Sequence, residues 1–368
     1  MKVETLIYAY LAICGAMIIF NIVCVFAFRR RDKNLTVYSD MFTKTVGEQI
    51  RRLEAGGQVE KKHCDMLMKK LGRVDYLMAL DETLETMYRE NPLAVSKYIQ
   101  SLSSVFVCLA LEYGKKSTLK ATYFPYFIKK YKVFHNHNIS VVSDVMLEMV
   151  RQPSLYCREN ALQALYSIGD CDQIIKALKI IDRSGYYHNA KMITDGLTTF
   201  DGDLKRLAEK LWHFYMTCKE EMKVAILNYF RFRSGDHCER MLEIMTEPDQ
   251  SQEICYACIR YFGKYHYEPA YPFLTAYAEY DRDGRWEYAA IAVSALANYP
   301  CDKTVDILKR QIHSHYWHVR CNASESLQCM GLGYEELIDV FEGTDRYAGE
   351  ILRYRLDQKR MVQEHGEV

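Results

Sequence analysis

The sequence predicts an all-α protein in which one N-terminal transmembrane helix is followed by a stack of helical pairs. Three observations indicate this fold class. Residues 6–28 form a run of 23 residues without a charge. Only 7 prolines and 18 glycines occur among 368 residues, so helix breakers are scarce. An amphipathic pattern recurs about every 31 to 35 residues through the later part of the chain.

These observations divide the chain into four segments. Residues 1–5 are expected to form a short extracytoplasmic N-terminus, 6–28 the membrane anchor, 29–153 a basic helical region of degenerate repeats, and 154–368 the helical repeat region. The composition, 49% hydrophobic and 26% charged, is that of a folded chain and excludes a disordered one.

The segment 6–28, LIYAYLAICGAMIIFNIVCVFAF, is expected to cross a membrane once. At about 1.5 Å per residue it gives about 34 Å of helix, enough for a hydrocarbon core about 30 Å thick. A cleaved signal peptide has a shorter apolar region that ends in small residues, whereas this run ends in Phe28 against three arginines. Only Lys2 opposes them, so the positive-inside rule places the N-terminus outside and the remainder in the cytosol. The membrane-proximal basic residues are Arg29, Arg30, Arg31 and Lys33.

The cysteine pattern agrees with a cytosolic location. Most of the 13 cysteines follow the anchor and are scattered singly through apolar helical patterns. Such cysteines are typical of small buried side chains in a reducing compartment, not of a disulfide framework. We therefore expect a single-pass protein of the cell membrane with a cytoplasmic helical region.

The clearest repeat unit begins at Cys157 and contains two amphipathic stretches, CRENALQALYSIGD and QIIKALKIID. The apolar residues of each stretch fall on one helical stripe, and Gly169-Asp170 separates the two. Two weaker copies, HNAKMITDGLTTFDGD and EEMKVAILNYFRFRSGD, follow it. With three later units, whose first helices end at Gly263, Asn298 and Gly331, they make six units from about Leu155. A small residue stands eight positions before the residue that ends each of the four clearest first helices: Ala161 before Gly169, Cys255 before Gly263, Ala290 before Asn298, and Ala323 before Gly331.

This pattern resembles the HEAT repeat family, in particular membrane-anchored bacterial proteins of that type. The match is best at 155–182 and 315–342, where Cys157-Arg158 and Val319-Arg320 precede an Asn-Ala pair. The resemblance implies a curved, right-handed α-solenoid that serves as a binding surface. Independently of it, one helical pair cannot bury its own apolar face and must stack on its neighbours.

Between residues 36 and 153 the repeat signal is weaker, but the pattern is still helical, with turn signals at Gly56-Gly57, Gly72, Asn91-Pro92 and Gly114. A second apolar run, 95–111, is interrupted by polar residues and is too short to span a membrane. We expect it to form a buried helix.

Charge is distributed unevenly although the net charge is zero. Residues 29–134 carry a net charge of +8, and residues 135–368 carry −8. The anionic cytoplasmic leaflet attracts basic residues, so anionic lipid is one expected ligand of the basic half. Lysines alternate with tyrosines and phenylalanines over 115–132, which is also typical of a surface that binds nucleic acid. An amphipathic helix has the same pattern, so we do not expect nucleic acid as a partner. The lysines are Lys115, Lys116, Lys120, Lys129, Lys130 and Lys132.

No catalytic residue and no cofactor is predicted. The chain has no glycine-rich phosphate loop, no GxSxG and no HExxH, and it lacks the His-Glu dipeptides of HEAT-like iron hydroxylases. The single CxxC, Cys255 and Cys258, has no second ligand pair and is expected to be structural. A group of His313, His315, His318 and Cys321 leaves a zinc site open as an alternative to polar loop residues.

The sequence thus favours a non-enzymatic, membrane-tethered scaffold or adaptor that binds a protein partner at the cytoplasmic face. Another membrane protein, such as a glycosyltransferase or polymer synthase of a bacterial envelope, is the partner class we expect. The alternatives are a HEAT-like enzyme, such as a lyase or nucleic-acid-modifying enzyme, and a binder of anionic lipid or nucleic acid. The candidate partner-binding residues, for which packing between repeats is the competing role, are Tyr256, Tyr288, Tyr316 and Trp317.

Overall fold

The computed structural model describes residues 3–116, 119–135, 139–279 and 285–365, and these contain helices but no strand. The predicted all-α class is therefore confirmed. The chain folds into two compact units. Unit 1 comprises Met1–Tyr187 and Thr199–Lys210, and unit 2 comprises His188–Thr198 and Leu211–Val368.

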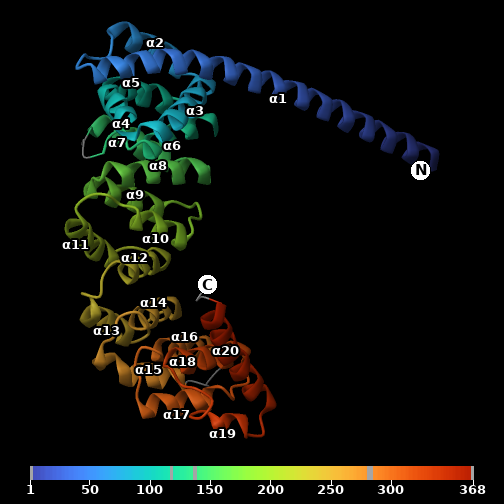
Figure 1. Ribbon diagram of the computed structural model, residues 1–368, viewed down its shortest axis with the longest axis vertical. Helices are drawn as coiled ribbons and strands as arrows, with labels where there is room; N and C mark the ends of the chain where they lie inside the picture. Colours follow the sequence, from blue (N-terminus) through green and yellow to red (C-terminus); the bar gives the residue numbers. More distant parts are fainter. Residues whose placement is uncertain (1–2, 117–118, 136–138, 280–284, 366–368) are drawn as a thin grey trace. The chain divides into compact units, whose positions relative to one another are not determined.

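The helices of unit 1 are short apart from the first, and Figure 1 labels its α-helices. They are α1 (Val3–Glu54), α2 (Lys61–Leu71), α3 (Val74–Glu90), α4 (Pro92–Ser101), α5 (Ser103–Gly114), the 3₁₀ turn η1 (Leu119–Thr122), α6 (Tyr123–Lys130), α7 (Ser140–Val150), α8 (Leu155–Ile168) and α9 (Cys171–Arg183).

Unit 2 contains the later helices and α10, while α11 (Leu204–Tyr215) begins in unit 1 and ends in unit 2. The helices of unit 2 are α10 (Ala190–Thr198), α12 (Glu220–Arg233), α13 (Cys238–Thr246), α14 (Gln252–Phe262), η2 (Glu268–Ala270), α15 (Tyr271–Ala278), α16 (Trp286–Leu296), α17 (Asp302–Gln311), α18 (Trp317–Cys329), α19 (Ile338–Phe341) and α20 (Arg346–His365).

Helix α1 has an exposed apolar part and a packed part. The large apolar side chains described between residues 8 and 28 are 50 to 73% exposed, and the segment is long and apolar enough to cross a membrane. Further along, Phe42 and Val46 are fully buried where α1 packs against α3 and α4. Figure 1 shows the first part of α1 extending beyond the helices that cover its second part. One continuous helix therefore joins the predicted anchor 6–28 to the folded unit.

The second apolar run of the sequence forms α4 and α5, which meet at an angle of 65°. Taken together the two helices have the length and composition of a membrane span. Their largest apolar side chains, including Tyr98 and Phe106, are nevertheless fully buried among the helices of unit 1. This burial agrees with the prediction that residues 95–111 belong to a protein core. The single helix expected there is instead two helices, because the chain bends between Ser101 and Ser103.

The clearest predicted repeat unit has the expected local structure. Helix α8 ends at Gly169, whose φ of +85° lies in the left-handed region that glycine adopts without strain. The side chain of Asp170 then accepts hydrogen bonds from the backbone N–H groups of Asp172 and Gln173 and so caps α9. Ala161, the small residue of this unit, is fully buried. The Gly-Asp pair therefore ends one helix and begins the next.

In unit 2 each helix of the even-numbered series contacts the next one in that series. Helix α12 packs against α10 and α14, α16 packs against α14 and α18, and α18 packs against α20. Small residues permit close approach: a Cβ added to Gly263 would lie 3.1 Å from the Cα of Ala295. Cys255, Ala290 and Ala323 are buried in the same way as Ala161. The six predicted first helices are thus all present, as α8, α10, α12, α14, α16 and α18.

The two units divide the chain between residues 187 and 211, inside the segment predicted as 154–368. The reason is that α8 packs against α6 and α7, and α9 packs against α7. The first predicted repeat unit is therefore continuous with the preceding basic region. The sequence pattern could not reveal this, because periodicity identifies a helical pair but not the neighbours on which it packs.

We predict that Ala161→Asp destabilises unit 1 by more than about 3 kcal/mol, because an unpaired carboxylate would be forced into a fully buried helix contact. Urea denaturation followed by circular dichroism measures this change. Tyr156→Asp is the matched control, since Tyr156 lies on the same helix and is 74% exposed. It should alter the free energy of unfolding by about 0.5 kcal/mol or less. Equal losses in the two variants would show that the assumed register of α8 is wrong.

Candidate functional site

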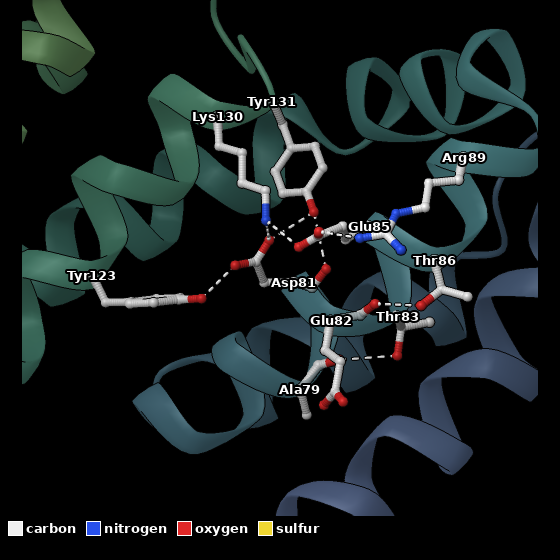
Figure 2. A network of polar contacts seen from close by, with 10 residues as sticks. All are labelled: Ala79, Asp81, Glu82, Thr83, Glu85, Thr86, Arg89, Tyr123, Lys130 and Tyr131. Carbon is white, nitrogen blue, oxygen red and sulfur yellow. Dashed lines mark hydrogen bonds and ion pairs between the residues drawn. The ribbon is translucent and has the colours of Figure 1, made fainter.

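The most extensive polar network of unit 1 surrounds Asp81, a buried residue of α3 (Figure 2). Its carboxylate accepts a hydrogen bond from the Tyr131 hydroxyl at 2.7 Å and forms an ion pair with the Lys130 ammonium at 2.7 Å. The Tyr123 hydroxyl donates to its other oxygen. Lys130 also pairs with Glu85 at 3.0 Å. The network therefore fixes α6 and the residue that follows it against α3.

The protonation of this network suits structure rather than catalysis. Burial, and then the hydrogen bonds to Asp81, raise the pKa of Tyr123 and of Tyr131 well above the usual value. Burial opposes the charge of Lys130, but its hydrogen bonds to Asp81 and Glu85 hold its pKa above the usual value. Both tyrosines are therefore neutral donors at physiological pH, and the lysine is a cation. A nucleophile or general base would need the opposite shifts.

Ion pairs account for several lysines of the alternating basic and aromatic stretch 115–132. Lys130 pairs with Asp81, Lys132 pairs with Asp201, and Lys116 pairs with Glu112 at 2.8 Å. The Lys120 side chain lies outside the described part of the structure. Three of the lysines predicted as a possible ligand surface are thus engaged in ion pairs within unit 1.

We predict that Asp81→Asn lowers the free energy of unfolding by about 2 to 4 kcal/mol, because a largely buried ammonium would lose the more buried of its two carboxylate partners and two tyrosine hydroxyls would lose a charged acceptor. Thermal denaturation of the full chain in detergent measures the effect. The control, Glu85→Gln, removes a carboxylate that is 48% exposed and should cost much less than Asp81→Asn. A loss no larger in Asp81→Asn than in this control would show that Asp81 does not hold the helices together.

The predicted partner-binding residues have different environments. Tyr256 and Tyr288 are only 6% and 7% exposed, and their rings meet edge to face at 4.8 Å. Tyr288 also stacks on Tyr277 at 5.1 Å. These two predicted residues therefore pack between α14, α15 and α16, which is the competing role that the sequence allowed.

Tyr316 and Trp317 belong to an aromatic surface formed where α16 and α18 begin. We call this set, Trp286, Tyr316, Trp317 and His318, the aromatic surface. Trp286 stacks on Tyr316 at 5.8 Å and on His318 at 5.0 Å. Trp317 contacts His318 edge to face at 5.1 Å and is 63% exposed. A pocket of about 210 Å³ lies beside Trp286 and Tyr316.

Trp286 is the member of this surface that sequence reasoning missed. It stands 32 positions before His318, which is one repeat spacing, and the two rings stack with an interplanar angle of 11°. Tyr256 and Tyr288 have the same spacing and also touch. Aromatic residues one repeat apart were therefore a usable signal for contacts between neighbouring first helices.

The histidine and cysteine candidates do not converge. His313 contacts Asp345, His318 stacks on Trp286, and the Cys321 thiol accepts a hydrogen bond from Arg355 at 3.0 Å. Among the residues that the structure describes, no group of three or more His, Cys, Asp or Glu side chains could hold a metal ion. The zinc alternative gains no support from this arrangement.

The CxxC cysteines, Cys255 and Cys258, lie inside unit 2. Both are buried, and burial raises the pKa of each thiol above its usual value. A reactive or metal-binding cysteine needs a thiolate, which this environment disfavours. Their placement therefore agrees with the structural role expected from the sequence.

Asp345 ties the start of α20 to α18. Its carboxylate contacts the Arg320 guanidinium at 2.9 Å and His313 at 3.2 Å, and it accepts hydrogen bonds from the backbone N–H groups of Tyr347 and Ala348. The Arg320 guanidinium, followed by these other donors, lowers the pKa of Asp345 to about 2. Asp345 therefore acts both as a helix cap and as an ion-pair partner.

This lowered pKa predicts acid sensitivity of the C-terminal end of unit 2. An aspartate in the unfolded chain has a pKa of about 3.9, so the stabilisation from Asp345 is complete above about pH 4. It is lost as the pH falls from 4 toward 2. Asp345→Asn should remove about 1 to 2 kcal/mol at pH 7 and flatten the pH dependence below 4. Urea titrations at several pH values measure both effects, and parallel curves for the two proteins would contradict the assignment.

Comparisons of the chain with models of known protein families and with curated proteins gave no match. The geometry of the described residues therefore carries the functional argument alone. It offers a membrane-compatible helix, an aromatic surface on unit 2, and polar networks that brace each unit.

Proposed function

We propose that the protein is a membrane-tethered scaffold whose helical pairs form a HEAT-like solenoid and whose unit 2 binds a protein partner. The observation that carries the proposal is the continuity of α1. Its exposed apolar part, 8–28, runs without a break into the part that packs against α3 and α4. A membrane helix joined in this way holds the folded region close to the bilayer, where a membrane-associated partner would be encountered.

Arg31 supports the same arrangement. Its guanidinium lies 3.8 Å from Asp75 and donates to the Met78 sulfur at 3.1 Å, so it fastens the membrane end of α1 to α3. Arg29, Arg30 and Lys33 are exposed on the same stretch of helix. In the proposal these three residues face the anionic cytoplasmic leaflet and set the orientation, with the N-terminus outside the cell.

The solenoid part of the proposal rests on contacts between residues one repeat apart. In unit 2, side chains of one first helix donate hydrogen bonds to backbone carbonyls of its neighbour at a recurring separation of 31 to 33 residues. These bonds run from Thr194 to Ala225 at 2.9 Å, from Asn322 to Ala290 at 2.7 Å, and from Ser326 to Val293 at 2.8 Å. A repeated register of this kind is what a stack of equivalent helical pairs produces.

The repeat arginines add a second point of support. Arg158 donates to the carbonyls of Gln152 and Pro153, which lie five or six residues before it. Arg320 likewise donates to Ser314 O, six residues before it. The arginine at the start of each of these two first helices therefore satisfies the carbonyls of the preceding loop, as expected if the two helices are equivalent members of a repeat.

The aromatic surface is the proposed contact for the partner. Trp317 exposes 63% of its surface although Trp286, Tyr316 and His318 hold the surrounding rings in place. Large aromatic side chains on a rigid base are the residues that most often dominate binding energy at protein interfaces. The ion pairs of Lys116, Lys130 and Lys132 make the basic half the weaker candidate.

We predict that the full chain, isolated from native membranes in mild detergent, retains one stoichiometric protein partner and that Trp317→Ala loses it. Truncation of a central interface tryptophan typically costs at least about 2 kcal/mol, or roughly 30-fold in affinity. Tyr354→Ala is the control, because Tyr354 is 64% exposed and also lies in unit 2. Recovery should be quantified by mass spectrometry against the bait.

Three outcomes would count against the proposal. Equal partner recovery with Trp317→Ala and with the control would remove the aromatic surface from the interface. Digestion of the helical region by protease added to intact cells would contradict the orientation, because a cytoplasmic region should be protected. Turnover of a small substrate by the purified chain without a partner would favour the enzyme alternative.

A further inference from the structure

A pocket of about 500 Å³ lies on unit 2, apart from the aromatic surface and the polar networks described above. Residues of four successive even-numbered helices line it, near the C-terminal ends of α12 and α14 and along α16 and α18. We call it the basic groove and define it by its polar and aromatic residues: Arg231, Phe232, Arg260, Lys264, Ser294 and Asn322.

The three cations of the basic groove have no acidic partner within the described part of the chain. Their side chains lie near aromatic rings: Arg231 is 4.7 Å from the centre of the Phe232 ring, and Arg260 is 5.9 Å from that of Tyr256. Lys264 is 5.8 Å from the Phe232 ring and 5.3 Å from the Tyr265 ring. Phe232 is itself 49% exposed, between two cations. The groove thus presents three positive charges, two of which lie near the Phe232 ring.

Unit 2 as a whole is acidic, since residues 188–198 and 211–368 carry a net charge of −7. Several other cations of the unit pair with a carboxylate at short distance: Lys309 with Asp339 at 2.7 Å, Arg320 with Asp345 at 2.9 Å, and Arg355 with Glu325 at 3.2 Å. The favourable dipole at a helix C-terminus stabilises one nearby cation, but it does not explain three cations around a single recess.

Burial and the charge of Arg260 lower the pKa of Arg231 below its usual value. An anion placed between the two guanidinium groups would offset their repulsion. Mutual repulsion among unpaired cations is typical of sites that recognise negatively charged ligands.

The number of cations in the groove favours one class of anion. A carboxylate carries one charge, so an acidic peptide would have to bring several side chains into one recess to match three cations. A diphosphate group carries about three negative charges within a few ångströms, and arginine forks match phosphate oxygens in a bidentate manner. The volume also falls within the range of about 300 to 1,000 Å³ that is usual for small-molecule sites.

We propose that the basic groove binds a phosphate-bearing small molecule, with a diphosphate group held by Arg231, Arg260 and Lys264. Ser294 and Asn322 line the same recess and supply neutral polar groups for the remaining phosphate or sugar oxygens. Phe232 offers a ring face on which a base or sugar can pack. The protein would thereby combine a membrane tether with a ligand site on its helical region, independently of the partner surface proposed above.

Isothermal titration calorimetry of the full chain in detergent micelles tests the proposal, with orthophosphate, pyrophosphate, uridine diphosphate and a hexaglutamate peptide as separate ligands at low salt. We expect saturable one-to-one binding of pyrophosphate at least about tenfold tighter than that of orthophosphate, because more charge-assisted hydrogen bonds form. Binding should weaken as ionic strength rises.

Variants locate the site. Arg260→Ala and Lys264→Ala change exposed side chains, so the fold should be retained, and each should weaken pyrophosphate binding at least about tenfold. Arg240→Ala is the matched control, since Arg240 is exposed and lies 4.7 Å from the centre of the Trp212 ring, as Arg231 does from Phe232. The pyrophosphate affinity of Arg240→Ala should stay within about twofold of that of the parent chain.

Phe232→Ala distinguishes a phosphate compound that bears a base or sugar ring from one that does not. Weaker binding of uridine diphosphate with unchanged binding of pyrophosphate would assign a ring-bearing ligand, and equal effects on both would assign a simpler phosphate compound. Trp317→Ala should leave pyrophosphate affinity unchanged, so failure of the partner proposal and failure of this one are separable.

Three results would overturn the assignment. They are the absence of saturable binding for both pyrophosphate and uridine diphosphate, equal weakening by Arg240→Ala and by the groove variants, and tighter binding of hexaglutamate than of pyrophosphate. The last result would assign the groove to an acidic protein segment instead.

Discussion

The close packing of α12, α14, α16 and α18, each between two other even-numbered helices, is the constraint on which unit 2 depends. In α16, seven of eleven residues are buried, and in α14 eight of eleven are, so neither helix has a wide polar face. A helix that is apolar on most sides is stable only when neighbours cover it from both directions. Small residues such as Ala290 and Gly263 let the backbones approach, and hydrogen bonds such as that from Asn322 to Ala290 O fix the register. The side chains left over at the helix ends are then free to form the aromatic surface and the basic groove.

In this protein the charge around a site differs from the net charge of the segment that contains the site. The later part of the chain is acidic overall, yet the recess lined by α12, α14, α16 and α18 gathers cations without carboxylates. The earlier part is basic overall, yet Lys130 and Lys132 are occupied by Asp81 and Asp201. Net charge describes the far field of a segment, whereas recognition depends on which side chains remain unpaired at short range. The ligand site that we propose therefore lies in the acidic half and not in the basic half.

The Asp81 network shows how a cluster with catalytic residue types can be structural. An aspartate, a lysine and two tyrosines meet there, but the carboxylate is already saturated by donors from α6 and Tyr131 (Figure 2). The tyrosine pKa values rise instead of falling, so no nucleophile is prepared. The same donors bind α6 to α3, and α3 in turn packs against α1. The network thus stabilises the part of unit 1 against which α1 packs.

The sequence by itself determined the helical class, the apolar segment 6–28 and the positions of the helix pairs, because these follow from local periodicity, charge and turn chemistry. Gly169 and Asp170, for example, end α8 and cap α9 through atoms only a few residues apart. Only the tertiary structure decided which side chains are exposed. Tyr288 and Trp317 are both aromatic residues near the start of a first helix, yet one is 7% and the other 63% exposed. Nothing local separates them, since exposure depends on what the neighbouring helices cover. Arg231, Arg260 and Lys264 were missed for the same reason: they come from two helices, and only packing brings them to one recess.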